Sequence, residues 1–482
     1  MTTSKRIGFF LGPSLFILLY FFFPAHLISP AAPKVLALAA WMLTWWITEA
    51  APIPVTAFLP LVGFPLLGVM KIGQSTAPYA NPVIFLFMGG FMIALALEKH
   101  KLHERIALKL IKLTGTSGNG IILGFMLASA LLSMWISNTA TAMMMLPIAV
   151  SVVHLILHDV KNLNELDNKR ERNFAIGLML SIGYACSLGG MATIIGTPPN
   201  VVFVGLLNDF YGIKISFAQW LIVGFPVATI LVLANYVLVT RVLFPNKLEK
   251  IKGSEELIAK RLQALGPIRK EEKLVLIIFS LTAFLWMFQQ PINAVLKLEL
   301  LNDTIVAMCG GLLMFIVPVD FKKGEFVLHW SDTEKLAWGI LFLFGGGLCL
   351  AEGLDKSGII PAVGQWIGGH SEFSIGLTLI LIVISVYLSE VMSNVALVNV
   401  FVPVVFGIAN VMEVNPILMG LPVTLGASIA LMFPIATPPN AIVFSSGYIR
   451  IQDMVRAGFW LNIVSILIIW VFSITLVNWL FL

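Results

Sequence analysis

The stretch SMWISNTATAMMMLP at residues 133–147 decides how this chain folds, because it places hydroxyl and amide groups inside an otherwise apolar run. A second copy, SEVMSNVALVNVFVP at residues 389–403, repeats the S-x-x-x-S-N spacing and carries its proline at the same offset. Each copy is followed by the sequence TPPN, at residues 197–200 and again at 437–440. Membrane proteins accommodate such polar groups mainly where they line a cavity, so the doubled pattern is the predicted functional site.

The composition places the chain in a lipid bilayer. Of its 482 residues, 59% are hydrophobic and 11% are charged, whereas about 25% of residues are charged in a typical soluble protein. The apolar runs are longer than the roughly 9–11 residues of a barrel strand, so we predict an all-α polytopic protein with about ten to twelve spans. The net charge of +5 reflects basic cytoplasmic loops, and we predict no nucleic-acid partner.

The sequence offers no pattern for a disulfide or a zinc site. Cys186, Cys309 and Cys349 are isolated in apolar surroundings, and we predict that they are packing residues. The sequence also lacks a nucleophile-base pair and a P-loop, so we predict that the protein is not an enzyme.

The region before the first motif is predicted to form spans interrupted by prolines. Residues 8–28 should form a retained first helix, with a cleavable signal peptide as the alternative. Residues 34–70 should form one span to about residue 50 and a broken segment after it, because prolines interrupt this run. Residues 81–97 form the next span, and a basic amphipathic piece reaching Lys112 should lie at the membrane surface.

The first motif itself predicts a helical hairpin. A single straight helix from Gly118 to Pro147 would bury the Asn138 amide in lipid, which costs several kcal/mol if the amide is unpaired. We therefore expect a turn at Ser137-Asn138-Thr139, with both arms on one side of the membrane. The charged residues Asp159–Arg172 should then form a solvated loop. The helices expected after this loop, with a break at the first TPPN, cover residues 174–195, 200–209 and 218–243.

A long polar segment, Pro245 to Lys273, divides the chain into halves, and we assign it to the cytoplasm. The second half should repeat the order of the first. We expect a broken apolar segment near 303–318, a charged loop reaching Lys335, and a span at 337–352.

Two separated matches support a repeat. The sequence FLFMGG at 85–90 matches FLFGGG at 342–347 at an offset of 257 residues, and the two SN motifs are offset by 256. We interpret the halves as inverted repeats, whose hairpins enter from opposite sides and bring both turns to the midplane of the membrane.

The motifs supply uncharged oxygen ligands. Ser133 and Ser137 stand at helical spacing and can share one face, with Asn138 next to them. A helix broken before TPPN exposes backbone carbonyls, and such oxygens suit Na⁺ in transporters. The helix N-termini beyond each turn suit an anion. Because neither motif contains Lys or Arg, a dianion would be neutralised by cations bound beside it.

Other interpretations of these polar residues stay open at this stage. Ser, Thr and Asn also join helices to one another in membranes. Glu390 is either a proton-coupling group or a hairpin-packing residue facing water, since its counterpart in the first copy is Met134. Glu49, at the predicted break after the second span, has the same two interpretations.

The motifs resemble those of the divalent anion/sodium symporter family, which includes sodium-dicarboxylate, citrate and sulfate cotransporters. The resemblance rests on the SNT at 137–139, the paired TPPN sequences and MFPIATPPNAIVFSSGYI at 432–449, and it extends over nearly the whole chain. It implies a homodimer with eleven transmembrane helices and two re-entrant hairpins in each protomer. It also implies a scaffold and a transport domain that moves as an elevator.

The family architecture gives the expected domains. Residues 1–115 and 274–372 would form the scaffold, and residues 116–243 and 373–482 the two transport halves. Residues 244–273 would form the cytoplasmic linker.

The resemblance also implies site residues. The first sodium site would use Ser133, Ser137, Asn138 and the Gly196 carbonyl, and the second would use Ser389, Met392, Asn394 and the Ala436 carbonyl. The substrate carboxylates would meet Asn138, Thr139, Thr197, Pro198, Asn394, Val395, Thr437 and Pro438. The second motif reads SNV where many members have SNT, so Val395 offers no hydroxyl to the substrate.

We therefore predict a transporter of the bacterial inner (plasma) membrane that brings C4 dicarboxylates such as succinate, fumarate or malate into the cell with Na⁺. The alternatives are a sodium-independent dicarboxylate exchanger of the same fold and a symporter for citrate or sulfate. An intramembrane hydrolase or a passive channel is the alternative from another class.

Overall fold

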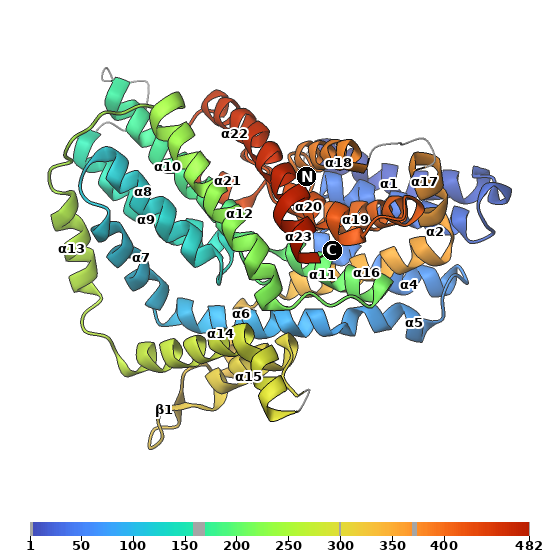
Figure 1. Cartoon of the computed structure of the whole chain (residues 1–482), viewed down its shortest axis with the longest axis horizontal. Coiled ribbons are helices and arrows are strands. Elements are labelled where there is room, and N and C mark those ends of the chain that lie inside the picture. The colour runs from blue at the N-terminus through green and yellow to red at the C-terminus, as the bar shows by residue number, and fades with distance from the viewer. Residues whose placement is uncertain (1–2, 158–168, 298–299, 369–373, 482) are drawn as a thin grey trace.

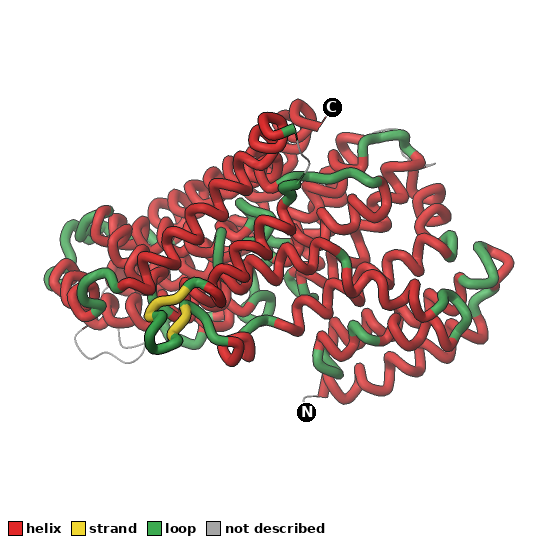
Figure 2. The backbone as a smooth tube through the Cα atoms, turned by 90° about the horizontal axis from the view of Figure 1, so that it is seen from below, coloured by secondary structure: helices red, strands yellow, loops and turns green. Residues whose placement is uncertain are grey.

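The computed structural model describes residues 3–157, 169–297, 300–368 and 374–481. The chain is nearly all helical, and the one small strand pair is drawn in yellow in Figure 2. Within the described residues, nine helical segments are long and apolar enough to cross a membrane, and shorter apolar helices accompany them. The protein is a multi-pass membrane protein, as predicted.

The first half contains the helices of the first motif and ends in the linker (Figure 1). Its helices are α1 (Thr3–Phe22), α2 (Ala32–Thr48), α3 (Ile53–Thr56), α4 (Leu59–Leu66), α5 (Ile72–Thr76), α6 (Pro82–Lys99), α7 (Leu102–Leu113), α8 (Gly118–Ser133), α9 (Asn138–Leu157), α10 (Lys169–Gly190), α11 (Pro198–Tyr211) and α12 (Phe217–Val237). The linker contains α13 (Ser254–Ala264).

The second half has a corresponding order of elements. They are α14 (Lys270–Leu296), α15 (Asp303–Ile316), β1 (Pro318–Asp320), β2 (Glu325–Phe326), α16 (Trp338–Lys356), α17 (Ile359–Gly368), α18 (Ser374–Ser389), α19 (Asn394–Val411), α20 (Pro416–Ala427), α21 (Pro438–Phe444), α22 (Ile451–Phe472) and α23 (Asn478–Phe481). The predicted inversion of the two halves stays a prediction.

Both predicted hairpins are present. The helices α8 and α18 have 16 residues each, which corresponds to a length of about 24 Å. This is shorter than the hydrocarbon core of roughly 30 Å. Each of these helices ends at a motif serine, and the next helix begins at the motif asparagine five residues later. The first arm of each hairpin is therefore suited to a re-entrant hairpin, whereas the second arms, α9 and α19, have 20 and 18 residues and are long enough to cross a membrane.

Two predictions about local structure were wrong in the described residues, and one element was not predicted. Residues 303–316 form one continuous helix, because no proline occurs between Asp303 and Ile316. The two-stranded antiparallel hairpin β1–β2 follows that helix and was not predicted. Of the expected loop Asp159–Arg172, residues 159–168 lie outside the described residues, and the rest forms the first turn of α10.

Close helix packing joins the elements that precede the motifs. A Cβ on Gly89 of α6 would lie 2.5 Å from the backbone of Ala307 of α15, so these helices touch through their backbones. The first helix packs on the second through stacked rings of Phe9 and Trp45, whose centroids are 5.8 Å apart. Other apolar side chains of α1, such as Phe10, are exposed, which suits contact with lipid.

The helices that follow the two TPPN sequences are exchanged between the halves. Helix α11 of the first half packs against α19 and α20, whereas α21 of the second half packs against α9 and α10 (Figure 1). The two broken helices thus join the halves into one body around the motifs.

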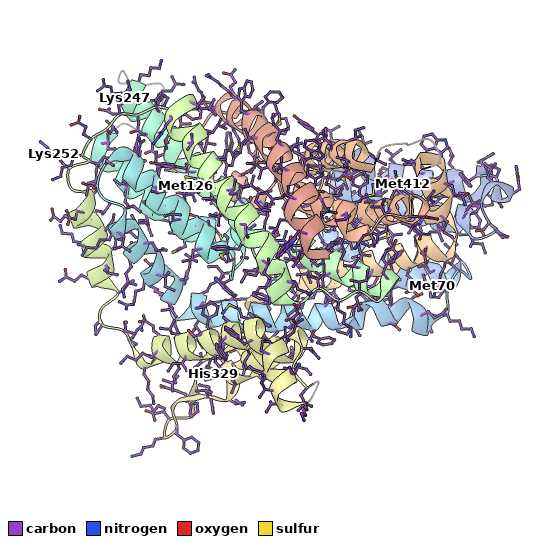
Figure 3. The ribbon with its side chains drawn as sticks, in the orientation of Figure 1. Met70, Met126, Lys247, Lys252, His329 and Met412 are labelled. Carbon is purple, nitrogen blue, oxygen red and sulfur yellow. The ribbon has the colours of Figure 1, made fainter. Side chains whose placement is uncertain are left out.

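The linker runs along the outer edge of the molecule, where Figure 3 labels Lys247 and Lys252. Its far end is held by Arg105 of α7, whose guanidinium lies 2.7 Å from the Glu272 carboxylate and donates to the Gly266 carbonyl at 2.9 Å. Both side chains are buried, and the additional hydrogen bonds offset the loss of hydration that a buried ion pair suffers.

Candidate functional site

The turn of the first hairpin separates the two motif serines. Helix α8 ends at Ser133, and the amides of Trp135 and Ile136 both donate to the Leu132 carbonyl at 2.9 Å. The Ser137 hydroxyl caps the next helix by accepting from the Ala140 amide at 3.1 Å. The prediction that Ser133 and Ser137 share a helix face was wrong, because the helix ends between them.

Oxygen atoms of the first half gather around Gly190 and Gly196. The position of a Cβ on Gly190 would be 2.8 Å from the Asn138 Oδ1 atom and 2.9 Å from the Gly196 carbonyl oxygen. A Cβ on Gly196 would lie 3.0 Å from the Ser133 carbonyl and 3.0 Å from the Thr193 hydroxyl. Only glycine leaves room for these oxygens to approach one another.

One of the polar atoms in this cluster has no hydrogen-bond partner in the described chain. The Asn138 Oδ1 atom is buried and unpaired. Leaving a buried polar atom unpaired costs about 1–3 kcal/mol, so such an atom beside other oxygens indicates a ligand. The oxygens are uncharged and partly from the backbone, a donor set that coupling cations use in transporters.

Sequence reasoning identified part of this cluster. Asn138, Ser133 and Gly196 were predicted. The structure brings the Asn138 side chain and the Gly196 carbonyl together, but it places the backbone carbonyl of Ser133 beside Gly196 and not the predicted hydroxyl. Gly190 and Thr193 were missed, although the glycine-rich end of α10 was visible in the sequence. The Thr193 hydroxyl donates to the Met134 carbonyl at 2.6 Å and so ties the unwound segment to the hairpin turn.

The second half arranges its motif differently. The buried Ser389 hydroxyl lies 2.8 Å from the Val386 carbonyl and 3.1 Å from the Ile429 carbonyl, within donating distance of both. The Asn394 Oδ1 atom is buried and unpaired, as in the first half. Met392 lies in the turn before α19, and Ala436 lies in the unwound segment before α21. Their use as ligands stays a prediction.

Glu390 is a buried residue that binds the unwound segment of its own half, before α21. Its Oε1 atom accepts from the Leu431 amide at 2.8 Å, the Met432 amide at 3.0 Å and the Asn462 side chain at 2.8 Å. The side chain is 2% exposed, so the interpretation of a packing residue facing water was wrong. At the same position of the first hairpin, the Met134 carbonyl accepts from Thr193.

These bonds predict the effect of removing the Glu390 carboxylate. In Glu390→Ala, the transport activity predicted from the sequence should fall roughly tenfold or more at every pH, because each charge-assisted bond contributes about 1.5–3 kcal/mol. Glu390→Gln should retain more uptake, since its carbonyl oxygen still accepts from backbone amides. Initial rates in proteoliposomes between pH 6 and pH 8 measure both variants. A pH profile that changes shape in Glu390→Gln would instead indicate proton coupling.

All predicted substrate residues lie at helix N-termini. Asn138 and Thr139 begin α9, and Asn394 and Val395 begin α19. The two TPPN sequences place their threonines just before α11 and α21 and their first prolines at the first helical position. Free amides and the positive end of the helix dipole favour an anion at such ends. Because α21 packs on α9 and α11 packs on α19, each motif helix is paired with the broken helix of the other half.

Helix α10 contacts polar residues of both halves. Gly190 lies beside Asn138, and the Asn440 Oδ1 atom lies 3.5 Å from the position of a Cβ on Gly183. These two glycines are seven residues apart on the helix, a distance of about 10 Å along its axis.

Two residues considered earlier lie outside this region. The Glu49 carboxylate is exposed and pairs with the Lys5 ammonium at 3.1 Å. Cys309 is exposed on α15, so its prediction as a packing residue was wrong, whereas Cys186 and Cys349 are buried. No group of three or more His, Cys, Asp or Glu in the described part of the chain could hold a metal ion.

The comparison with known proteins starts from the whole chain. Residues 7–482 match the family described as the sodium:sulfate symporter transmembrane region. The chain belongs to this family. Members of the family are membrane transporters, so the predicted resemblance is confirmed and the protein is a transporter and not an enzyme.

Similar proteins include two named sodium-dependent dicarboxylate transporter SdcS. The one from Staphylococcus saprophyticus is 38% identical over 479 residues, covering 97% of this chain and 90% of the relative. The one from Staphylococcus aureus strain MRSA252 is 39% identical over 477 residues, with the same coverage.

Two solved structures share the fold. The YdaH transporter of Alcanivorax borkumensis superimposes with a TM-score of 0.60 at 13% identity, covering 92% of this chain and 98% of that one. MtrF of Neisseria gonorrhoeae gives a TM-score of 0.56 at 12% identity, covering 86% and 85%.

Proposed function

We propose that the protein takes up C4 dicarboxylates such as succinate, fumarate and malate by sodium-coupled symport across the bacterial plasma membrane. The observation that carries this proposal is the convergence of Asn138 Oδ1 and the Gly196 carbonyl on Gly190, with the buried Asn138 Oδ1 atom left unpaired. The names of the relatives from Staphylococcus support the same substrate class and the same coupling ion.

Charge balance explains why the ions and the anion would bind together. The motifs contain no Lys or Arg, so a dianion depends on cations and helix N-termini for neutralisation. Moving a charge against the membrane potential costs about 2.3 kcal/mol per charge per 100 mV. Two Na⁺ cancel the charge of a dicarboxylate, and a third makes inward transport favourable at a negative interior.

The movement would be that of an elevator in a homodimer. The scaffold would consist of residues 1–115 and 274–372, and the transport domain of residues 116–243 and 373–482. The Asn81 amide donates to both Asp209 carboxylate oxygens, at 3.0 and 2.9 Å, and links these two parts. This contact must break if the transport domain slides along the scaffold.

A sulfate symporter is a second candidate, because the family description names sulfate. Val395 is 8% exposed. It offers no hydroxyl where the resemblance leads us to expect one. This absence reduces the number of polar contacts available to the second carboxylate of a dicarboxylate. Competition by sulfate and citrate against labelled succinate separates these substrates.

Uptake into proteoliposomes tests the proposal. An inward Na⁺ gradient should accumulate labelled succinate above its external concentration, whereas an equal K⁺ gradient should not. Accumulation that requires only internal dicarboxylate, without Na⁺, would identify an exchanger and overturn sodium coupling.

A further inference from the structure

The last residue of each TPPN sequence contacts the unwound segment that precedes it. The Asn200 Nδ2 atom donates to the Thr193 carbonyl at 2.8 Å and lies 3.4 Å from the Gly190 carbonyl. The Asn440 Nδ2 atom donates to the Ala430 carbonyl at 2.9 Å and to the Phe433 carbonyl at 3.1 Å. Both asparagines are fully buried.

The two contacts are the same contact made twice. Each asparagine reaches back seven and ten residues, and the corresponding positions in the two halves are all 240 residues apart (440 minus 200, 433 minus 193 and 430 minus 190). Other contacts at the unwound segments differ between the halves, since Trp220 binds the first and Glu390 binds the second. The asparagine contact is the shared one.

From this we infer that Asn200 and Asn440 are positioning residues for cation binding, which fix the carbonyl oxygens of residues 190–196 and 430–436. The inference rests on the proposed function, because it assigns a role to residues behind the proposed ion sites. Neither asparagine was among the predicted ligands.

The chemistry of the amide supports this role. A backbone carbonyl only accepts hydrogen bonds, so the side chain facing it must donate. The Oδ1 atoms of Asn200 and Asn440 are both buried without a partner in the described chain. Each side-chain amide therefore makes hydrogen bonds only through its Nδ2 atom. These donated bonds are what hold the side chain in its position.

The unwound segments need such a donor. The prolines at residues 198, 199, 438 and 439 have no backbone N–H, so they cannot bind the carbonyls that precede them. The asparagine supplies donors from its side chain to other carbonyls of the same segment, those of residues 190 and 193 or 430 and 433. By holding the Gly190 and Thr193 carbonyls, Asn200 also holds the backbone on which the Gly196 carbonyl lies beside Asn138.

The test replaces each asparagine by its isosteric acid. In Asn200→Asp and Asn440→Asp, the Na⁺ concentration for half-maximal succinate uptake should rise at least about tenfold, the effect of losing a bond worth about 1.4 kcal/mol. The KM for succinate at saturating Na⁺ should stay close to that of the wild type. A residue that only stabilised the fold would not change the Na⁺ concentration for half-maximal uptake while leaving the KM for succinate unchanged.

Asn173 provides a matched control. Its buried side-chain amide also donates to a backbone carbonyl, that of Pro245, at 2.9 Å, but it lies at the other end of α10. Asn173→Asp should leave the Na⁺ dependence unchanged.

A binding measurement covers variants that insert poorly. Na⁺ should raise the melting temperature of the purified wild-type protein. This increase should be smaller in Asn200→Gln and Asn440→Gln, and it should be smallest in the two Asp variants. An unchanged Na⁺ dependence in both Asp variants, or an equal loss in Asn173→Asp, would overturn the inference. If the rate of uptake by the wild-type protein does not depend on Na⁺, the proposed function is overturned instead.

Discussion

Gly190→Ala is expected to weaken the Na⁺ affinity of sodium-driven uptake strongly while the protein still inserts into the membrane. The added methyl group would lie 2.8 Å from the Asn138 Oδ1 atom and 2.9 Å from the Gly196 carbonyl oxygen, so both would have to move. Overpacking of this kind costs about 1–3 kcal/mol, which corresponds to a loss in cation affinity of roughly 5- to 150-fold. Initial rates of succinate uptake against Na⁺ concentration measure the effect.

The same helix provides the control. A Cβ on Gly177 would meet its nearest neighbour, a methyl group of Val239, at 3.4 Å, which is an ordinary contact. Gly177→Ala should therefore transport like the wild type. If Gly190→Ala also kept a normal Na⁺ dependence, the oxygen cluster around Gly190 would not be a cation site.

Asn138→Ala and Asn394→Ala should each reduce accumulation by about a hundredfold or more. Each asparagine is proposed to contact both a cation and the substrate, and each Oδ1 atom is buried without a partner in the described chain. Hydrogen bonds to charged groups contribute about 1.5–3 kcal/mol each, and losing two of them multiplies the effects. Membrane fractionation checks insertion, and uptake into proteoliposomes gives the rate.

Asn119 is the corresponding control on the first hairpin. Its side chain accepts from the Asn246 amide at 2.9 Å, a contact between α8 and the linker. Asn119→Ala should keep most of the uptake. Normal accumulation by either Asn138→Ala or Asn394→Ala would remove that residue from the site.

Much of the fold follows from local signals in the sequence. Paired prolines at 198–199 and 438–439 remove backbone donors, so the helix breaks there could be predicted without knowing the neighbours. The hairpins could be predicted because Asn138 and Asn394 are too polar to face lipid. The linker was visible from its charge.

The role of Glu390 could not be predicted from the sequence. Its partners are backbone amides some forty residues away and a side chain at residue 462. Nothing in the local sequence distinguishes an acid that binds buried amides from one that titrates.

The sequence by itself determined that this chain lies in a membrane, where its helices break and which residues end up at helix termini. These properties depend on hydrophobicity and on proline, which act within a few residues. Only the tertiary structure decided that Asn138, Gly190 and Gly196 share one cluster, and that α11 and α21 each pack on the other half. Those distances join segments far apart in the chain, and they are set by the packing of all the helices together.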